Sequence, residues 1–499
     1  MVENKGSNYI AQSPEPNRSS LSEQKNEKES KARGNNILLT LLVNVCRLVV
    51  GATFVFSGFV KAIDPTGTQY KIQDYLAAAG LAGALPGWLT LVVSVLLAAL
   101  EFCLGVFMLF AMHRRLVSKI TVAFMVVMTL ITVWLAAFNP IKDCGCFGDA
   151  IHLTNTQTLL KNIILLACAV VVAWKPLLMY RFLSRSTQWI AVNYTILFIL
   201  LLSGHCLYHL PILDFRPYHV GVNIKKGMEI PEDAPQPQFE TTFIMEKNGV
   251  RKEFSLDNYP DSTWQFIDSK TIQTKEGYTP PIHDFSIQLA DGDDITDSIL
   301  SRRGYTFLLI SPHLENADDS NFGDIDQIYE YSQEQGIPFY CLTASTEKDI
   351  QHWENITGAE YQFFMTDETT LKTIIRSNPG LLLLKDGTII RKWSHNDLPS
   401  GKKLQGPMSK LDIGHMPNSS MGKTIGQVCL WFFLPLLLLV FADRTWAWTK
   451  FLKSHQTRYF QRLKTKRNEK ENRSRQLENE REPAGGRSPG KGNQRDSEG

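Results

Sequence analysis

Long apolar runs dominate the first 210 residues of this 499-residue chain, and one more lies close to its C-terminal end. The hydrocarbon core of a membrane is about 30 Å thick, so a helix needs about 20 apolar residues to cross it. By this measure the pattern predicts six membrane-spanning helices. They are residues 37–60, 86–111, 117–138, 158–174, 188–208 and 424–442. The fourth is the weakest, because Lys161 lies near its start.

The apolar positions have a different spacing between the fifth and sixth runs, where short segments alternate. Residues 239–246 and 250–256 have the period of two that is typical of a β-hairpin, and residues 280–296 have the pattern strand, turn, strand. Apolar strands and helical segments then follow one another and end in a hairpin that turns at Asp386-Gly387. These elements are the strands 304–311 and 337–345, the helices 325–336 and 347–358, and the hairpin 380–394. The alternation predicts a domain built on an α/β sheet.

Clusters of Lys and Arg lie in every second connection between the predicted spans. They precede the first span, separate the second from the third and the fourth from the fifth, and follow the sixth. Because positive residues stay on the cytoplasmic side of a membrane, this alternation predicts cytoplasmic N and C termini and a periplasmic segment at 209–423. The predicted location is the bacterial inner membrane, with several passes through the lipid bilayer. The net charge of +2 provides no overall field for nucleic acid, so such a partner is not expected.

These patterns predict a fold class, an α-helical membrane bundle with an α/β domain outside the cytoplasm. The polar N-terminal residues lack the apolar core of a signal peptide and are expected to form a disordered arm. The predicted segments are the arm 1–35, a four-helix membrane domain 36–180, a fifth span 186–208, a linker and β-rich segment 209–279, an α/β domain 280–423, a sixth span 424–442 and a basic, disordered tail 443–499.

Two of the eight cysteines, Cys144 and Cys146, form a local pair in the sequence DCGCFGD at 143–149. A disulfide across one intervening residue closes a small ring, and strain makes such a bond easy to reduce. The two are therefore a candidate catalytic redox pair in a periplasmic loop, where thiols can cycle. The alternatives are a structural turn and a metal site, which the one-residue spacing disfavours. The other cysteines, including Cys341, are expected to be inert, most of them buried.

The first four spans resemble the DoxX-like family and, within it, the methylamine-utilisation MauE type. The resemblance rests on RLVVGATFVFSGFVKAIDP at 47–65, Tyr75, ALEFCLGVFML at 99–109 and CGCFGD at 144–149, which follow the order of the family's motifs. It implies a four-helix membrane bundle. MauE-type members are associated with maturation of a periplasmic, disulfide-rich dehydrogenase subunit, so the resemblance implies a role in the maturation of envelope proteins.

Residues 280–395 resemble a thioredoxin-like fold through PPIHDFSIQLADG at 280–292 and NPGLLLLKDG at 378–387. The resemblance places a cis-proline at Pro379. After the strand YTFLLI the family has Cys-x-x-Cys at the head of a helix, whereas this chain has SPHLENADD, which contains no cysteine. The domain is therefore expected to be inactive as an enzyme and to bind an extended peptide of a partner near Pro379 and His313. A plain surface position is the alternative for His313.

Arg47 and Glu101 are ionisable residues inside predicted spans, each about ten residues, or about 15 Å, from the cytoplasmic end. Charges inside a membrane are costly and usually face a partner, so the two are expected to pair as an intramembrane polar site. Such a pair is either structural or part of a quinone or proton site under the cysteines. Lys61 and Asp64, at the rim of the first span, are expected to snorkel or cap.

The sequence thus predicts a membrane protein that supports thiol–disulfide exchange or envelope-protein maturation through Cys144 and Cys146. A periplasmic protein is the expected client, and a quinone is the cofactor considered. The alternative is a non-catalytic membrane scaffold whose thioredoxin-like domain binds a partner. A transporter is less favoured, because the spans contain no broken-helix pair or internal repeat.

Overall fold

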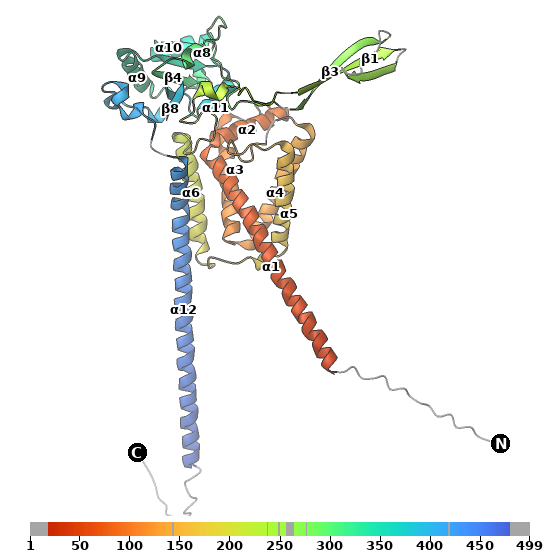
Figure 1. Cartoon of the computed structure of the whole chain (residues 1–499). Coiled ribbons are helices and arrows are strands. Elements are labelled where there is room, and N and C mark those ends of the chain that lie inside the picture. The colour runs from red at the N-terminus through yellow and green to blue at the C-terminus, as the bar shows by residue number, and fades with distance from the viewer. Residues whose placement is uncertain are drawn as a thin grey trace, which may run out of the picture.

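The computed structural model describes residues 18–141, 144–236, 238–247, 250–255, 264–275, 277–417 and 420–479. The molecule has two main parts, a bundle of long helices and an α/β domain that sits on one end of the bundle (Figure 1). The α/β domain defines the domain-facing end of the bundle.

Six helices in the described part of the chain are long and apolar enough to cross a membrane, which confirms the six predicted spans. The core of the bundle is formed by α1 (Arg18–Ile63), α3 (Gly87–Leu109), α4 (Arg114–Phe138) and α5 (Asn155–Trp174). Beside it lie α6 (Gln188–Tyr208) and α12 (Met421–Asn479), and α2 (Pro65–Ala78) lies across the domain-facing end (Figure 1).

Glycines bring α1 and α3 into close contact. A Cβ added at Gly58 would lie 2.4 Å from the backbone nitrogen of Phe102, and one added at Gly105 would lie 2.6 Å from the nitrogen of Val55. Small residues allow helix backbones to approach each other in membranes, where packing replaces the hydrophobic effect. These contacts fix the register of the two helices, with Gly58 opposite Phe102.

The last span packs against α6 through aromatic and polar contacts. The Tyr194 hydroxyl donates to the Trp431 carbonyl at 2.7 Å, and the rings of Phe198 and Phe432 have centroids 4.7 Å apart. Nearer the opposite end of the bundle, the Ser184 amide donates to the Asp443 carboxylate at 2.8 Å. The α6–α12 pair is therefore held along much of its length.

The α/β domain is built on a five-stranded sheet in the order β6-β5-β4-β7-β8. The parallel strands are β4 (Tyr305–Ser311), β5 (Phe339–Thr343) and β6 (Gln362–Met365), and the antiparallel ones are β7 (Gly380–Lys385) and β8 (Thr388–Ser394). Its helices are α7 (Ile224–Met228), α8 (Thr296–Leu300), α9 (Phe322–Glu334), α10 (Glu347–Thr357) and α11 (Glu368–Ile374). The predicted strands at 304–311 and 337–345 and helices at 325–336 and 347–358 are confirmed within a few residues.

Successive residues of β4 point to opposite sides of the sheet. Both faces therefore carry apolar side chains, and helices cover both. Phe307 belongs to an apolar cluster that includes Ile328 of α9. Leu308 belongs to the other cluster, which includes Leu371 of α11. The peptide bond between Asn378 and Pro379, just before β7, is cis. This strand order with its cis-proline is that of a thioredoxin-like fold, which confirms the predicted fold class.

The turn between β7 and β8 forms where the sequence predicts it. Asp386 and Gly387 have φ values of 50° and 73°, as a two-residue type I′ hairpin turn requires. The predicted strand pattern at 280–296 is wrong, since this fully described stretch forms only isolated bridges from Gln288 to Asp294 and Met365. Its Asp-rich and Gly-containing sequence disfavours a regular strand.

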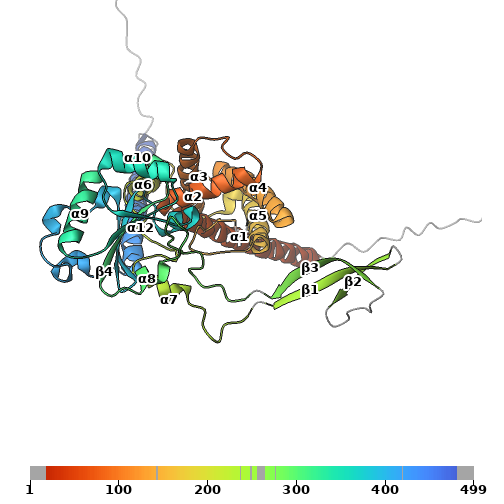
Figure 2. The same ribbon diagram turned by 90° about the horizontal axis from the view of Figure 1, so that it is seen from above.

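A separate three-stranded sheet projects from the α/β domain, away from the helices (Figures 1 and 2). Its order is β2-β1-β3, with β1 (Gln238–Lys247), β2 (Val250–Ser255) and β3 (Gln265–Lys275). The β1–β2 pair is the predicted hairpin, and β3 is an addition that the sequence pattern did not indicate.

Two segments that were expected to be disordered contain helix instead. Helix α1 already begins at Arg18, inside the predicted arm, and α12 continues through the basic tail to Asn479. Residues 443–479 contain no Gly or Pro and are rich in Lys, Arg, Glu and Gln, which are good helix formers. The remaining parts of both predicted disordered segments, 1–17 and 480–499, lie outside the described residues.

The close approach of α1 and α3 can be tested with Gly58→Leu. The added side chain must push the helices apart, and overpacking of this kind costs about 1–3 kcal/mol. We expect a lower midpoint of thermal unfolding in detergent. Gly204→Leu on α6 is the matched control, because a Cβ there meets nothing within 4 Å. Equal midpoints for the two variants would contradict the packing described.

Candidate functional site

The cysteine loop, residues 144–149, lies between α4 and α5 at the domain-facing end. Gly145 and Gly148 have φ values of 62° and 52°, which glycine adopts without steric cost. The sulfur atoms of Cys144 and Cys146 are 2.8 Å apart and share a hydrogen bond. A disulfide has a sulfur–sulfur distance of about 2.05 Å, so a small movement can close the bond. The preceding Asp143 lies outside the described residues.

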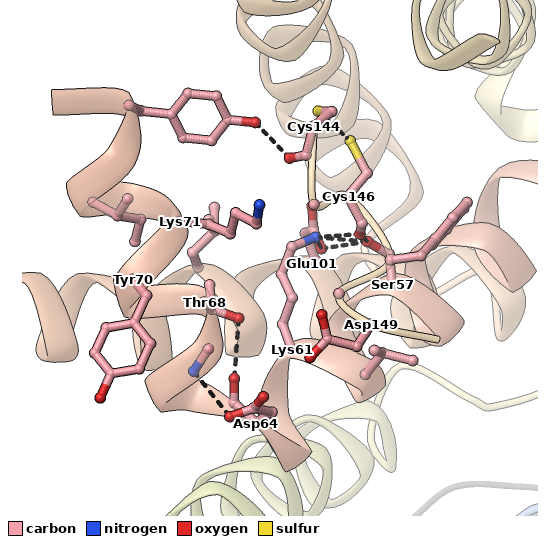
Figure 3. A pocket seen from close by; sticks show the side chains of 18 of the residues that line it. Ser57, Lys61, Asp64, Thr68, Tyr70, Lys71, Glu101, Cys144, Cys146 and Asp149 are labelled. Carbon is pink, nitrogen blue, oxygen red and sulfur yellow. Dashed lines mark hydrogen bonds and ion pairs between the residues drawn. The ribbon is translucent and has the colours of Figure 1, made fainter. Parts of the chain in front are cut away.

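Side chains from two helices hold the cysteine loop by its backbone carbonyls (Figure 3). The Tyr75 hydroxyl of α2 donates to the carbonyl of Cys144. Ser57 Oγ and Lys61 Nζ, both from α1, donate to the carbonyl of Cys146 at 2.7 and 2.8 Å. With both carbonyls fixed, the two sulfur atoms keep a defined position relative to the bundle.

Lys61 forms a buried ion pair with Glu101 of α3, with 2.7 Å between Nζ and Oε2. Each side chain is 6% exposed. The three N–H groups of the ammonium have three acceptors, which are Ser57 Oγ, Glu101 Oε2 and the Cys146 carbonyl. The prediction that Lys61 snorkels is therefore wrong, because a carboxylate inside the bundle offers it a partner. Asp64 caps α2 as predicted, accepting from the Gly67 amide at 2.9 Å.

Arg47 does not pair with Glu101, so the predicted intramembrane pair is also wrong. Arg47 Nη1 donates to the Tyr180 carbonyl at 2.8 Å, and the guanidinium lies 5.5 Å from the centroid of the Phe182 ring. The reason is the α1–α3 register. Glu101 lies beside Gly58, about eleven residues and therefore about 16 Å along α1 from Arg47.

The charges around the cysteine loop favour ionisation of Cys146. The hydrogen bond from Cys144 lowers the pKa of the Cys146 thiol, and the nearby ammonium groups of Lys161 and Lys61 lower it further, against the effects of burial and of the Glu101 carboxylate. The same hydrogen bond, together with burial, raises the pKa of Cys144. Lys161 extends from the second turn of α5, with its ammonium 4.2 Å from the centroid of the Phe147 ring. The pair is therefore asymmetric, and Cys146 ionises first.

A cavity of about 780 Å³ opens beside the cysteine loop and extends into the bundle. Polar residues line its domain-facing end. Among them are Ser57, Lys61, Glu101, Cys144, Cys146 and Lys161. Apolar side chains line its depth, among them Phe124, Met125, Met128, Ile131 and Leu165. The cavity thus places a thiol pair at the polar mouth of an apolar chamber.

Arg376, which follows α11, anchors the α/β domain over this cavity. Its guanidinium is 3.0 Å from the Asp64 carboxylate and 3.4 Å from the Asp149 carboxylate of the cysteine loop. It also lies 5.4 Å from the centroid of the Tyr70 ring of α2. The Arg376 side chain is 8% exposed. One arginine therefore joins the α/β domain, the end of α1 and the cysteine loop.

The two residues predicted to bind a partner, His313 and Pro379, lie at one place in the α/β domain. Asn378, which precedes Pro379, donates to the His313 carbonyl at 2.8 Å and accepts from Ser311 at 2.7 Å. The His313 imidazole lies 2.9 Å from the carboxylate of Glu368, and Glu368 lines the cavity. The thiol-free position of the thioredoxin-like fold is therefore connected to the cavity through Glu368. Cys341 is fully buried, as expected, and burial raises the pKa of its thiol.

The structure defines a multi-pass membrane protein with a thioredoxin-like domain and an anchored dithiol loop. Residues 39–175 match the family model "Methylamine utilisation protein MauE". The match covers the four core helices and the cysteine loop, so this bundle is of the MauE type. The resemblance to DoxX-like proteins stays a prediction.

Residues 239–276, which contain most of the projecting sheet, match a "Domain of unknown function (DUF8463)". The chain is also similar to the solution structure of a candidate protein disulfide isomerase from Bacteroides thetaiotaomicron, with 16% identity and a TM-score of 0.19. That likeness covers 23% of this chain and 76% of the other. Because the identity and the TM-score are this low, the thioredoxin-like fold is identified from the strand order and the cis-proline alone. No protein of curated function matches the chain.

Sequence reasoning found the two cysteines and Glu101 but missed the residues that connect them. The pattern puts Lys61 at the membrane rim and marks Lys161 only as an interruption of a span, and it does not single out Arg376. Ser57, Lys61 and Tyr75 belong to the MauE-like motifs, and this is the sequence feature that marks them as candidates. No local signal marks Arg376, because its partner Asp64 lies 312 residues away.

The Arg376 anchor predicts that Arg376→Gln loosens the α/β domain from the bundle. Two carboxylates would lose their cation, and we expect a bulky maleimide to alkylate reduced Cys144 several-fold faster than in the unchanged protein. The control is Arg391→Gln, which removes a pair with the exposed carboxylate of Asp412. An unchanged rate in Arg376→Gln would show that Arg376 does not restrict access to the loop.

The lowered pKa of Cys146 predicts a thiolate that persists below the ordinary thiol pKa of 9.0. As the pH falls through the lowered value, this thiolate and its ultraviolet absorbance should disappear. The signal is isolated as the difference between the reduced protein and Cys146→Ser. In Cys144→Ala the main hydrogen bond is absent, so the transition should move to higher pH. A transition at the ordinary pH in both proteins would refute the asymmetry.

Proposed function

We propose that the chain is a thiol–disulfide exchange protein of the bacterial cytoplasmic membrane, with Cys144 and Cys146 as the exchanging pair. The observation that carries this proposal is the anchored dithiol, whose sulfur atoms lie 2.8 Å apart at the mouth of a cavity between two domains. A merely structural turn would not need a lysine pair that favours the thiolate of one cysteine.

The proposed orientation has both termini in the cytoplasm and the α/β domain outside. It is supported by the clusters of Lys and Arg, which lie at or beyond the end of the bundle opposite the α/β domain. At that end Arg114 and Arg115 begin α4, Arg181 and Arg185 lie in the connection before α6, and the basic residues of α12 follow the last span. Positive residues remain on the cytoplasmic side. The cysteine loop would then face an oxidising compartment.

The asymmetry of the pair suggests the order of the exchange. A thiolate of the client attacks Cys144 of the disulfide, and Cys146 leaves, because the sulfur with the lower pKa is the better leaving group. A second client thiol then attacks the client sulfur of the mixed disulfide and releases Cys144. The client gains a disulfide, and Cys144 and Cys146 become two thiols. Lys61 and Lys161 stabilise the departing Cys146 thiolate.

The α/β domain is proposed to bind the client rather than to react with it. His313 and Pro379 form its binding position, which has no cysteine but lies next to the cavity mouth through Glu368. A thioredoxin-like fold can hold an extended peptide beside its cis-proline. A bound peptide there would present its own cysteines to Cys144.

The exchange is reversible, so Cys144 can also attack a disulfide of the client. In Cys146→Ser the mixed disulfide formed in this way at Cys144 should persist, because Cys146, whose attack on Cys144 would release the client, is missing. Intact cells would be treated with a membrane-impermeant alkylating reagent, and disulfide-linked partners identified by mass spectrometry. Cys144→Ser is the matched control and should trap far less. Labelling of Cys144 from outside in the unchanged protein also tests the orientation.

Two outcomes would overturn the proposal. One is a Cys144–Cys146 disulfide that stays fully oxidised in cells and resists reductant. The other is full biological activity of a Cys144→Ser, Cys146→Ser double variant. Either result would leave the protein as a membrane scaffold whose thioredoxin-like domain binds a partner.

A further inference from the structure

We infer that the cavity beside the cysteine loop binds a lipid-soluble quinone that accepts the electrons collected by the thiol pair. This inference rests on the proposed function and names the electron acceptor of the same site. It depends on the extent of the cavity, on the position of Lys161 and on the electron balance of the exchange.

The cavity has the size and the access that such a ligand needs. Its volume of about 780 Å³ lies within the range of about 300–1,000 Å³ that is usual for pockets of organic ligands. Val127 and Ile131 of α4 line it, and they are also 56% and 39% exposed on the surface of the helix bundle. The cavity therefore reaches a face of the bundle that contacts lipid. A molecule dissolved in the bilayer can enter there without passing the α/β domain.

The domain-facing end of the cavity offers a hydrogen-bond donor beside the reactive sulfur. Lys161 and Cys146 both line the cavity. Within the described part of the chain, the Lys161 ammonium has no hydrogen-bond partner and is placed only over the Phe147 ring. An ammonium binds a carbonyl oxygen through a strong, charge-assisted hydrogen bond. A quinone oxygen would satisfy Lys161, and its ring would lie among the aromatic and apolar walls.

The N–H groups of the Lys61 ammonium already have acceptors, so Lys61 and Lys161 have different roles at this site. All three of these N–H groups are directed to Ser57, Glu101 and the Cys146 carbonyl, as the cluster in Figure 3 shows. Lys61 therefore positions the loop, whereas Lys161 is available to a ligand. A quinone held by Lys161 would lie beside the loop that carries both cysteines.

The electron balance of the exchange requires an acceptor of two electrons and two protons, and a quinone is such an acceptor. After a client has been oxidised, Cys144 and Cys146 are two thiols. Their return to a disulfide releases two electrons and two protons. A quinone takes up two electrons and two protons and becomes a hydroquinone, so the reaction balances with no other reactant.

Binding can be tested on the full-length Cys144→Ser, Cys146→Ser protein, in which no redox step occurs. The probe is a benzoquinone with a decyl tail, and the readout is quenching of tryptophan fluorescence, because Trp134 lines the cavity. We expect saturable binding that Lys161→Gln weakens by about tenfold or more, as for the loss of a hydrogen bond to a charged group. Lys161→Arg should retain most of the affinity.

A pair of tryptophan substitutions on α4 locates the site. Met128→Trp fills the cavity and should abolish the saturable quenching. Leu130→Trp lies on the same helix but is 65% exposed toward lipid, so it should bind like its parent. Quenching that never saturates, or that is equal in all these variants, would mean that the cavity holds acyl chains or detergent and would overturn the inference.

The redox step has its own readout in the reduced protein with both cysteines, under exclusion of oxygen. We expect one hydroquinone to form per protein, detected by its absorbance, while Cys144 and Cys146 together lose their reactivity toward alkylation. If Cys146→Ser traps a client but the quinone neither binds nor oxidises the thiols, the inference fails and the exchange function stands. If the quinone binds but the thiols never exchange, the exchange function fails.

Discussion

The buried ion pair between Lys61 and Glu101 organises the whole thiol site. Removing two charges from water costs several kcal/mol per ion, and the pair is tolerable only if every polar atom finds a partner. Here one of those partners is the Cys146 carbonyl. The ion pair and the cysteine loop therefore depend on each other. Without the loop the ammonium would lack an acceptor, and without the ammonium the loop would lose one of its fixed points.

The sequence predicted the features that depend on local pattern and missed those that depend on register. The positions of the spans follow from the lengths of the apolar runs, and the hairpin at Asp386-Gly387 follows from turn chemistry. Both are confirmed. The partner of Glu101 could not be found in the same way. From a sequence, depth along a helix follows only from the distance to the span ends, whereas the contact of Gly58 with Phe102 sets which residues face each other. A shift of about four helical turns exchanges Arg47 for Lys61.

The same distinction applies to the boundary between the two domains. The missing Cys-x-x-Cys and the cis-proline could be predicted from the segments around 311–319 and 378–387. The arginine that joins this domain to the cysteine loop could not, because ion pairs between distant segments leave no periodic trace in a sequence. Arg376 has two carboxylates and an aromatic ring around it, and each comes from the membrane part. The thioredoxin-like domain thus contributes contacts and cover to a reaction centre that belongs to the bundle.

The pairing of α6 with α12 has a consequence for how such a chain can be assembled. The chain leaves the membrane at the end of α6, forms the α/β domain and returns at the start of α12. These two helices touch through Phe198 and Phe432. Its entry and exit are therefore neighbours, a geometry in which insertion of a domain is well tolerated. The backbone carbonyls of the cysteine loop are held by α1 and α2, which do not belong to this pair. The chain has the architecture of a four-helix membrane bundle extended by one cassette, in which α6 and α12 precede and follow the α/β domain.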